Sequence, residues 1–514
     1  MNRGVMRFRG LALVAVLTIG LAACAIEFRN PQSPTANPPI SPQLSTQTAP
    51  GGAPATQTAP APALRPAQTP TLDPARGIPA TGVMTGTYTI RRGDTLGGIA
   101  AAFDMDTADL QRLNGISNPG LIQPGQTLFI LEAVSGNGPS VKLIPDSELV
   151  NGPAAAAFDA GAFIAAQPGY LKSFSETVDG VPMDGARIVA RAAELASVNP
   201  RVLLALIEFS SGWLSDPAPA DGKLHYPLGN TKTGITTSLF LQLQWATARL
   251  NEGYYGWRLG TRLTVRLADG GRAFVGDRIN AGTAALQNYL AATNLRGGWL
   301  TAASAPGFVA TYQRLFGDPW QYDLGPPVPP GLAQPALALP WRAGETWFLT
   351  GGPHASWAAG TPWGAIDFAS VNTWGCRELG DWVTAMAPGV VARSGLGDVA
   401  QSLDPSGDER IGWSVLYLHI GTPDRVARGT QLKTGDAIGH PSCEGGYALG
   451  AHVHVARKHN GEWLNAAGDL AFTIAGWRPV EGVEEYDGGL VRGAESREAC
   501  ECKEVDKNGL TAGP

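Results

Sequence analysis

The chain has 514 residues, enough for roughly two to four domains of ordinary size. Its formal net charge is −6, charged residues make up only 16%, and no run of Lys and Arg forms a basic stripe, so the composition excludes an obvious nucleic-acid partner. The high counts of Gly (66) and Pro (40) indicate linkers and loop-rich β structure rather than long helices.

The first residues have the pattern of a targeting segment. Arginines precede an apolar stretch, LALVAVLTIGLAAC, that is too short to span a bilayer comfortably. It ends in Leu21-Ala22-Ala23-Cys24, which resembles a bacterial lipobox. We therefore expect residues 1–23 to be a lipoprotein signal peptide and Cys24 to be the lipidation site. The mature protein would lie outside the cytoplasm, lipid-anchored to the cell membrane or outer membrane. The alternative is a plain secreted protein with an incidental cysteine.

Residues 24–85 are rich in Pro, Ala and Thr and contain few large apolar side chains. Such a segment cannot bury enough surface to fold, and its prolines keep it extended. We expect a disordered tether.

Residues 86–131 predict a small βααβ domain. A strand at Tyr88 and Ile90 precedes two short helices, and Pro-Gly turns lead into a last strand near Ile130. The halves YTIRRGDTLGGIA and LQRLNGISNPGLIQPGQTLFI resemble the LysM family over the whole segment. The resemblance implies a shallow groove for N-acetylglucosamine polymers. A spacer domain is the alternative, since a fold alone does not guarantee a site.

Residues 132–148 have the composition of a linker, and residues 149–325 predict a helical middle domain. Apolar residues recur at helical spacing in DGARIVARAAELASVNPRVLLALIEFSSGWL, where an Asn-Pro pair ends one helix and begins the next. The stretch distantly resembles lysozyme-like domains, whose acid would stand at Ser210. Glu208 lies about 200° around the helix from that position. Because a glycosidase needs its acid, we expect a degenerate scaffold.

Residues 326–338 form a Pro-rich linker, and residues 339–480 alternate β-branched strands with Gly-rich turns, which predicts an antiparallel all-β domain. In AHVHVAR, residues two apart share one face of a strand. His452 and His454 therefore point the same way, and the valines that alternate with them point into a core.

Two further histidines and one aspartate occur in this region. His419 ends the strand SVLYLHI, His354 lies in a turn, and Asp367 begins a strand. Histidine nitrogens and carboxylate oxygens suit zinc (Zn2+), and a catalytic zinc site needs three protein ligands and an open position. On these residues alone, a packed or surface histidine pair remains an equal alternative.

Three separated motifs carry a specific resemblance: LPWRAGETWFLTGGPHASWAAGTPWGAIDFA, LYLHI and CEGGYALGAHVHVARKHNGEW. They resemble the lysostaphin-type zinc metalloendopeptidases, and most closely the beta-lytic and staphylolytic branch. Much of that family has a histidine four residues before the aspartate, where this chain has Trp363. The branch places it on an earlier loop, at the position of His354. The resemblance implies that His354, Asp367 and His454 are the zinc ligands.

The same resemblance implies that His419 and His452 are the catalytic histidines beside the metal. Bound zinc lowers the pKa of its water to about 7 and polarises the peptide carbonyl. One histidine can accept the proton of the water, and the other can donate to the oxyanion or the leaving amine. Which histidine does which stays open. Substrates of the family often contain glycine next to the cleaved bond.

Four cysteines follow Cys24, and an oxidising location favours disulfides. Cys376 and Cys443 are the candidate pair. A bridge between Cys500 and Cys502 would be strained, so their pairing stays open, with a metal role as the alternative. The acidic residues 481–514, which are short of apolar side chains, predict a flexible tail.

Together these features predict a surface-anchored zinc metalloendopeptidase that hydrolyses peptide cross-bridges of bacterial peptidoglycan and is targeted to the wall by LysM. Its partners would be peptidoglycan and, through the lipid, a membrane. The alternative is a non-catalytic peptidoglycan-binding or amidase-activating lipoprotein. A second, glycosidase activity would need an acid that Ser210 does not supply.

Overall fold

The computed structural model describes residues 81–90, 94–102, 105, 107–231, 238–373, 375–377 and 380–513. The expected signal peptide, Cys24 and almost all of the expected tether lie outside these residues. Within them, no helix combines the length and the apolar character that crossing a bilayer requires.

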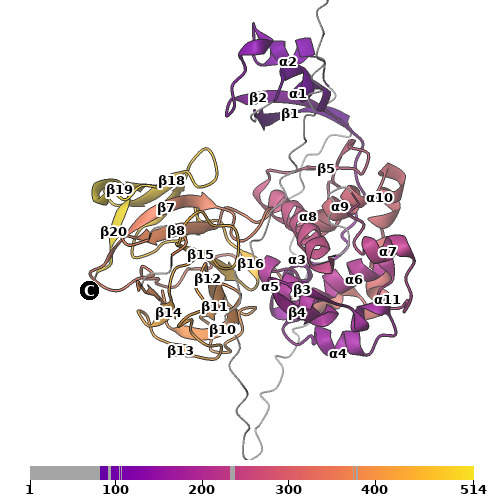
Figure 1. Ribbon diagram of the computed structural model, residues 1–514. Coiled ribbons are helices and arrows are strands. Elements are labelled where there is room, and N and C mark those ends of the chain that lie inside the picture. The colour runs from indigo at the N-terminus through magenta and orange to yellow at the C-terminus, as the bar shows by residue number, and fades with distance from the viewer. Residues whose placement is uncertain are drawn as a thin grey trace, which may run out of the picture. The chain divides into compact units, whose positions relative to one another are not determined.

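The first described part has the expected βααβ order (Figure 1). Its elements are β1 (Thr81–Thr89), α1 (Leu96–Ala102), α2 (Thr107–Leu113) and β2 (Thr127–Ser135). The two strands pair antiparallel, and Leu110 and Leu128 are fully buried between the strands and the helices. Both strands extend beyond the expected limits of 86 and 131.

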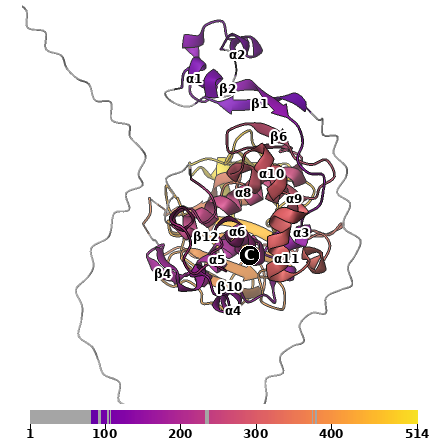
Figure 2. The same ribbon diagram turned by 90° about the vertical axis from the view of Figure 1, so that its right-hand side faces the viewer.

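A helical region follows. Its helices are α3 (Asp146–Leu149), α4 (Ala160–Ala165), α5 (Gly185–Ala196), α6 (Pro200–Ser211), α7 (Asp221–His225), α8 (Leu239–Leu259), α9 (Ala281–Thr293), α10 (Arg296–Ala302) and α11 (Ala310–Phe316). Two small hairpins join them: β3 (Ser175–Val178) with β4 (Val181–Asp184), and β5 (Thr264–Arg266) with β6 (Arg272–Phe274). Figure 2 shows α8, α9 and α10 on one side of this region.

The Asn-Pro pair separates two central helices as the sequence predicts. The Asn199 side chain accepts a hydrogen bond from the backbone of Arg201, and Pro200 occupies the first turn, where its missing N–H costs nothing. The expected linker at 132–148 is wrong, because Leu143 and Ile144 are buried in the helical core. Their apolar side chains drive this segment into the fold.

A nine-stranded antiparallel sheet makes up most of the C-terminal part. Its strands run in the order β13 (Gln431–Leu432), β10 (Gly389–Gly395), β11 (Asp398–Ser402), β12 (Trp413–Leu418), β15 (Val453–His459), β8 (Ala365–Ser370), β7 (Thr346–His354) and β20 (Gly509–Thr511), and β16 (Glu462–Trp463) pairs with β15. A separate pair joins β9 (Val383–Thr384) and β14 (Ala437–Gly439). As the alternation of side chains along β15 predicts, Val453 and Val455 are fully buried in the core beside the large sheet.

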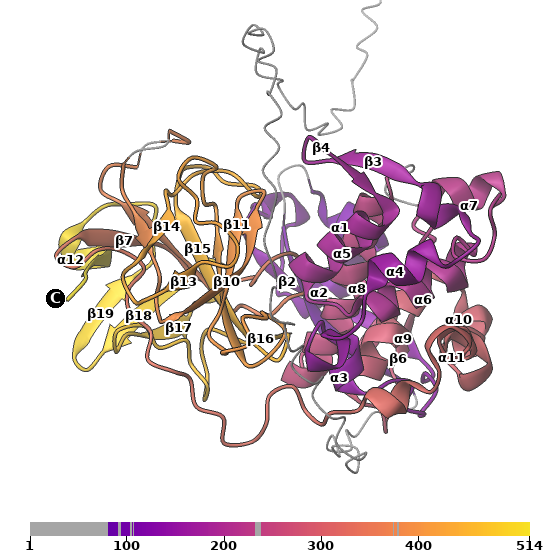
Figure 3. The same cartoon turned by 90° about the horizontal axis from the view of Figure 1, so that it is seen from below.

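The expectation of a flexible tail is wrong. Residues after 477 form a sheet of β17 (Arg478–Glu481), β18 (Gly488–Arg492) and β19 (Glu495–Glu498), followed by α12 (Val505–Asn508) and β20 (Figure 3). Strand β20 closes one edge of the large sheet, with Leu510 opposite Trp347. Leu490 and Leu510 are both 1% exposed, so a few well-spaced apolar side chains anchor an otherwise polar segment.

The helical region and the large sheet share a buried boundary. Arg191 of α5 forms an ion pair of 3.1 Å with Asp398 of β11, and both side chains are almost fully buried. The Tyr254 hydroxyl donates to Glu462 at 2.8 Å, and the Tyr255 hydroxyl accepts from the backbone of Trp463 at 2.9 Å. The Pro-rich segment at 326–338, which has no helix or strand, leads from one part to the other.

A buried charge cluster in the sheet yields a stability prediction. Glu409 accepts from Arg393 and from Lys458, each at 2.8 Å, and Lys458 is 3% exposed. Burial alone would raise the pKa of Glu409, but the two cations hold that pKa well below its usual value of 4.5. Glu409→Gln leaves the Lys458 ammonium without a counter-charge, so we expect a loss of about 3 kcal/mol in the free energy of unfolding.

Urea denaturation at pH 7 measures this loss, with the exposed Glu504→Gln as the control. Because the folded pKa of Glu409 is depressed, its contribution is present above about pH 4.5 and disappears as the pH falls below that value. Wild type and variant should therefore converge in acid. Equal stabilities at pH 7 would contradict the assignment.

Candidate metal centre

Three neighbouring strands bring the candidate metal ligands together. His354 is the last residue of β7, Asp367 lies in β8, and His454 lies in β15. His454 pairs directly with Asp367 in the register of the sheet. Strand β7 pairs with β8 through two irregularities before His354, and such bulges re-aim side chains. A Cβ at Gly351 would lie 2.9 Å from the Asp367 carboxylate, so glycine there leaves the carboxylate room.

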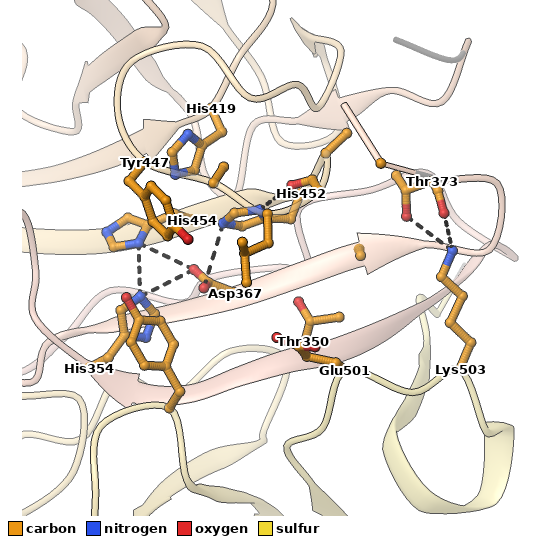
Figure 4. A pocket seen from close by; sticks show the side chains of 17 residues that line it. Thr350, His354, Asp367, Thr373, His419, Tyr447, His452, His454, Glu501 and Lys503 are labelled. Atoms are coloured by element: carbon orange, nitrogen blue, oxygen red, sulfur yellow. Dashed lines mark hydrogen bonds and ion pairs between the residues drawn. The ribbon is translucent and has the colours of Figure 1, made fainter. Parts of the chain in front are cut away.

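The three side chains form a nearly equilateral triangle of nitrogen and oxygen atoms (Figure 4). Nε2 of His354 lies 3.0 Å from Nδ1 of His454. Oδ1 of Asp367 lies 3.3 Å from the first nitrogen and 3.2 Å from the second. All three residues are at least 94% buried, with exposures of 2%, 6% and 5% for His354, Asp367 and His454.

The hydrogen bonds of the outer ring nitrogens determine whether the inner nitrogens of these histidines carry a proton or a lone pair. Nδ1 of His354 lies 2.8 Å from the Gly352 carbonyl, and Nε2 of His454 lies 3.0 Å from the Ser356 carbonyl. A carbonyl only accepts, so each of these nitrogens carries the proton. In the neutral rings, the inner nitrogens then face each other with lone pairs, beside a carboxylate oxygen. Such an arrangement is repulsive unless a cation lies between the three atoms.

The size of the triangle fits zinc. A tetrahedral zinc ion with bonds of about 2.0–2.1 Å separates its ligand atoms by about 3.3 Å, close to the observed edges. Oδ1 of Asp367 is buried and has no hydrogen-bond partner among the described residues. Burial would raise the pKa of Asp367, but His354 and His452 hold that pKa well below its usual value, so the ligand set is ready as an anion.

His419 and His452 lie beside this triangle, with ring centroids 4.5 Å apart. Nδ1 of His419 lies 2.8 Å from the Glu444 carbonyl, and Nδ1 of His452 lies 2.8 Å from the Gly450 carbonyl. Each ring therefore turns Nε2 away from these carbonyls, where it can take part in proton transfer, and Nε2 of His452 lies 3.6 Å from Oδ2 of Asp367. Burial, followed by the neighbouring histidines, lowers the pKa of His419 to about 3, so this ring is neutral at pH 7.

The backbone of His419 has a φ of 63°, a left-handed conformation that is unusual for a residue other than glycine. It is held there by backbone hydrogen bonds from Ile420 to Gly397 and from Ser442 to His419. Strain that the surroundings maintain is typical of functional positions.

These residues line one cleft of about 510 Å³. One wall is the segment that contains Tyr447 and Leu449, which are 87% and 71% exposed. A disulfide between Cys376 and Cys443, the pair that the sequence analysis favours, connects that segment to the loop after β8. All residues that line the cleft belong to the C-terminal part.

Sequence reasoning missed the opposite wall, because it treated the tail as flexible. Tyr486 stacks on the His354 ring, with centroids 4.1 Å apart, and its carbonyl accepts from Gly352. Glu501 and Lys503 also line the cleft. The Cys500–Cys502 disulfide, a pairing that the sequence left open, lies in the same segment. Two cysteines and Tyr486 in a segment expected to be flexible were the available signal.

The helical region offers no comparable acid–base pair at the position that the sequence singled out. The Ser210 hydroxyl lies 3.2 Å from that of Tyr289. Glu208 accepts hydrogen bonds from Ser215 and Arg314, and these contacts outweigh burial and lower its pKa. It is therefore held as a carboxylate, which is unsuited to donating a proton to a glycosidic oxygen.

Comparisons with known proteins agree with this geometry. Residues 88–131 match the family described as "LysM domain", and residues 142–329 match "LasA, N-terminal domain". The second match spans most of the helical region.

Among curated relatives, "Protease LasA" of Pseudomonas aeruginosa (strain UCBPP-PA14) is 29% identical over 373 residues, which cover 68% of this chain and 81% of the relative. "Beta-lytic metalloendopeptidase" of Achromobacter lyticus is 28% identical over 159 residues, or 29% of this chain and 40% of the relative. A solved structure described as "A Novel M23 Metalloprotease Pseudoalterin from Deep-sea" covers 32% of this chain and 96% of its own, with 24% identity and a TM-score of 0.28.

Because that TM-score is low, the comparison depends on the sequence matches. The two family models cover the LysM segment and the helical region, and the match to LasA extends over 68% of the chain. The chain is therefore a metalloendopeptidase that is similar to the lysostaphin-type enzymes, and it has a segment that matches the LysM domain and one that matches the N-terminal domain of LasA.

Proposed function

We propose that this protein is a zinc endopeptidase that hydrolyses the peptide cross-bridges of bacterial peptidoglycan. The observation that carries the proposal is the triangle of Nε2 of His354, Oδ1 of Asp367 and Nδ1 of His454, with edges of 3.0–3.3 Å. Three ligands of this kind leave one position of a tetrahedral ion open towards the cleft. Bound there, zinc would supply Lewis acidity for the attack of water on a peptide carbonyl.

The chain's own residues provide the proton transfers. His419 and His452 line the cleft beside the ligands, and their Nε2 atoms are the ones available for proton transfer. One accepts the proton that the attacking water releases, and the other donates a proton to the leaving amine. Their Nδ1 atoms are fixed on the carbonyls of Glu444 and Gly450, so neither ring has to reorient during the reaction.

Tyr486 supports the ligand set from the opposite wall. Its ring covers the face of His354 and fixes the plane of that imidazole. Burial raises the pKa of Tyr486, so its hydroxyl stays protonated at neutral pH and can donate a hydrogen bond into the cleft. A donor at this place would stabilise negative charge that develops on the carbonyl oxygen.

The other parts of the chain suit an enzyme that works on a cell wall. The LysM domain would hold the protein on N-acetylglucosamine polymers, so that a polymeric substrate stays near the cleft. We also propose an extracytoplasmic location with a lipid on Cys24, supported by the lipobox-like sequence around that residue.

A non-catalytic, amidase-activating role is disfavoured by the site itself. Buried histidines and a buried aspartate with matched geometry are costly to keep unless they bind an ion. His419 and His452 are also present, and the Nδ1 atom of each lies 2.8 Å from a backbone carbonyl that fixes its ring.

The first test removes one ligand. His354→Ala deletes one corner of the triangle, so we expect purified protein to lose stoichiometric zinc and to release no peptide ends from peptidoglycan. Elemental analysis and amine-release assays measure the two quantities. His225→Ala, at an exposed position on α7, is the matched control. If His354→Ala kept full wall hydrolysis, the assignment would be lost.

The second test separates metal binding from proton transfer. His419→Ala and His452→Ala leave the three ligands in place, so zinc content should stay near one ion per chain. Loss of a general acid or base should lower kcat by roughly a hundredfold to ten-thousandfold. Elemental analysis together with steady-state kinetics on a glycine-containing peptide decides the point. Loss of zinc in either variant would instead make that histidine a ligand.

A further inference from the structure

The cleft continues beyond the histidines to a second group of polar side chains. Thr350 of β7 and Glu501 and Lys503 of the C-terminal segment line it. Figure 4 shows these three residues along the strands, away from the four histidines. The hydrolytic mechanism uses none of them, so their presence in the cleft needs another explanation.

The N–H donors of the Lys503 ammonium already have hydrogen-bond acceptors within the protein. Its Nζ donates to the carbonyl of Val371 at 3.1 Å, to the carbonyl of Thr373, and to the Thr373 hydroxyl at 3.2 Å. An ammonium has three N–H donors, and three oxygens receive them. Lys503 therefore fastens the C-terminal segment to the loop after β8 and has no donor left for a ligand.

The backbone around Glu501 is fixed from the other side. The Asn508 amide, which is fully buried, donates to the carbonyls of Leu349 at 3.1 Å and Cys502 at 2.7 Å. The Cys500 N–H donates to Leu349 at 3.2 Å, and a disulfide joins Cys500 to Cys502. Glu501 thus projects from a short loop that is anchored on both flanks, next to the strand that carries Thr350.

The Glu501 carboxylate has no hydrogen bond or ion pair to any other described residue. The Thr350 hydroxyl, whose oxygen is buried, also lacks a partner there. The facing wall, with Tyr447, Leu449 and Gly450, carries no charge. Asp367, the other carboxylate that lines the cleft, is surrounded by histidines. A rigidly presented carboxylate with a neighbouring hydroxyl matches a primary ammonium group, which offers several donors to oxygen acceptors.

We propose that Glu501 is a specificity-determining residue that binds a primary ammonium group of the substrate peptide. The inference depends on the proposed function, because it needs a peptide in the cleft. An α-amine at a peptide end and the side-chain amine of a diamino acid share this chemistry, and the experiment distinguishes them.

The test compares matched peptides on the full-length, zinc-loaded protein. One pair of glycine-containing peptides differs only in lysine against norleucine, and a second pair differs only in a free against an acetylated α-amine. Each is assayed with wild type, Glu501→Gln, Glu501→Lys and the control Glu504→Gln, whose side chain lies outside the cleft.

We expect Glu501→Gln to lower kcat/KM roughly fivefold or more for an amine-bearing peptide and to leave its neutral twin unchanged. Glu501→Lys should lower it further, and added salt should shrink the difference. The pair that shows the effect identifies which amine is bound.

Equal losses on both members of each pair, or no loss on either, would overturn the role of Glu501 while leaving the proposed peptidase intact. A zinc-loaded wild type that cleaves none of the peptides and no wall would overturn the proposed function, and this inference with it.

Discussion

The candidate metal centre depends on three buried acceptor atoms that face one another. Two carbonyls, of Gly352 and Ser356, take the outer protons of His354 and His454. The inner nitrogens are thereby turned into facing lone pairs beside the Asp367 oxygen. Oδ1 of Asp367 has no hydrogen-bond partner among the described residues other than these ring nitrogens, which lie 3.2–3.3 Å away. Positive charge at the centre, from a metal ion or a shared proton, makes the arrangement favourable, and the surrounding fold holds the three atoms at a spacing that suits zinc.

The antiparallel sheet supplies the spacing. Direct pairing of His454 with Asp367 fixes two ligands across adjacent strands, and the irregular end of β7 brings in the third. Two segments outside these strands form the walls of the cleft. The disulfide-tied segment with Tyr447 shapes one side, and the C-terminal segment with Tyr486 and Glu501 shapes the other. The chemistry is thus central, while recognition lies on loops that cross-links hold in place.

Part of this could be predicted from sequence. Alternation in AHVHVAR placed both histidines on one face and their neighbouring valines in the core, and the family resemblance carried by the three motifs implied the ligand set. The tail could not be predicted in the same way. Its last strand, β20, pairs with β7 across more than a hundred residues, and only a few apolar side chains such as Leu490 and Leu510 mark the strands of the tail. Local composition carries no information about such pairing. The prediction of a linker at 132–148 was wrong for a similar reason, because Leu143 and Ile144 pack in a core formed by helices that lie far away in the sequence.

The most direct measurement of the central claim is anomalous X-ray scattering at the zinc absorption edge from crystals of the purified protein. The account predicts one strong peak bonded to Nε2 of His354, a carboxylate oxygen of Asp367 and Nδ1 of His454. A zinc peak held by any other set of residues, or three side chains that hydrogen-bond to one another with no ion in zinc-containing buffer, would contradict it.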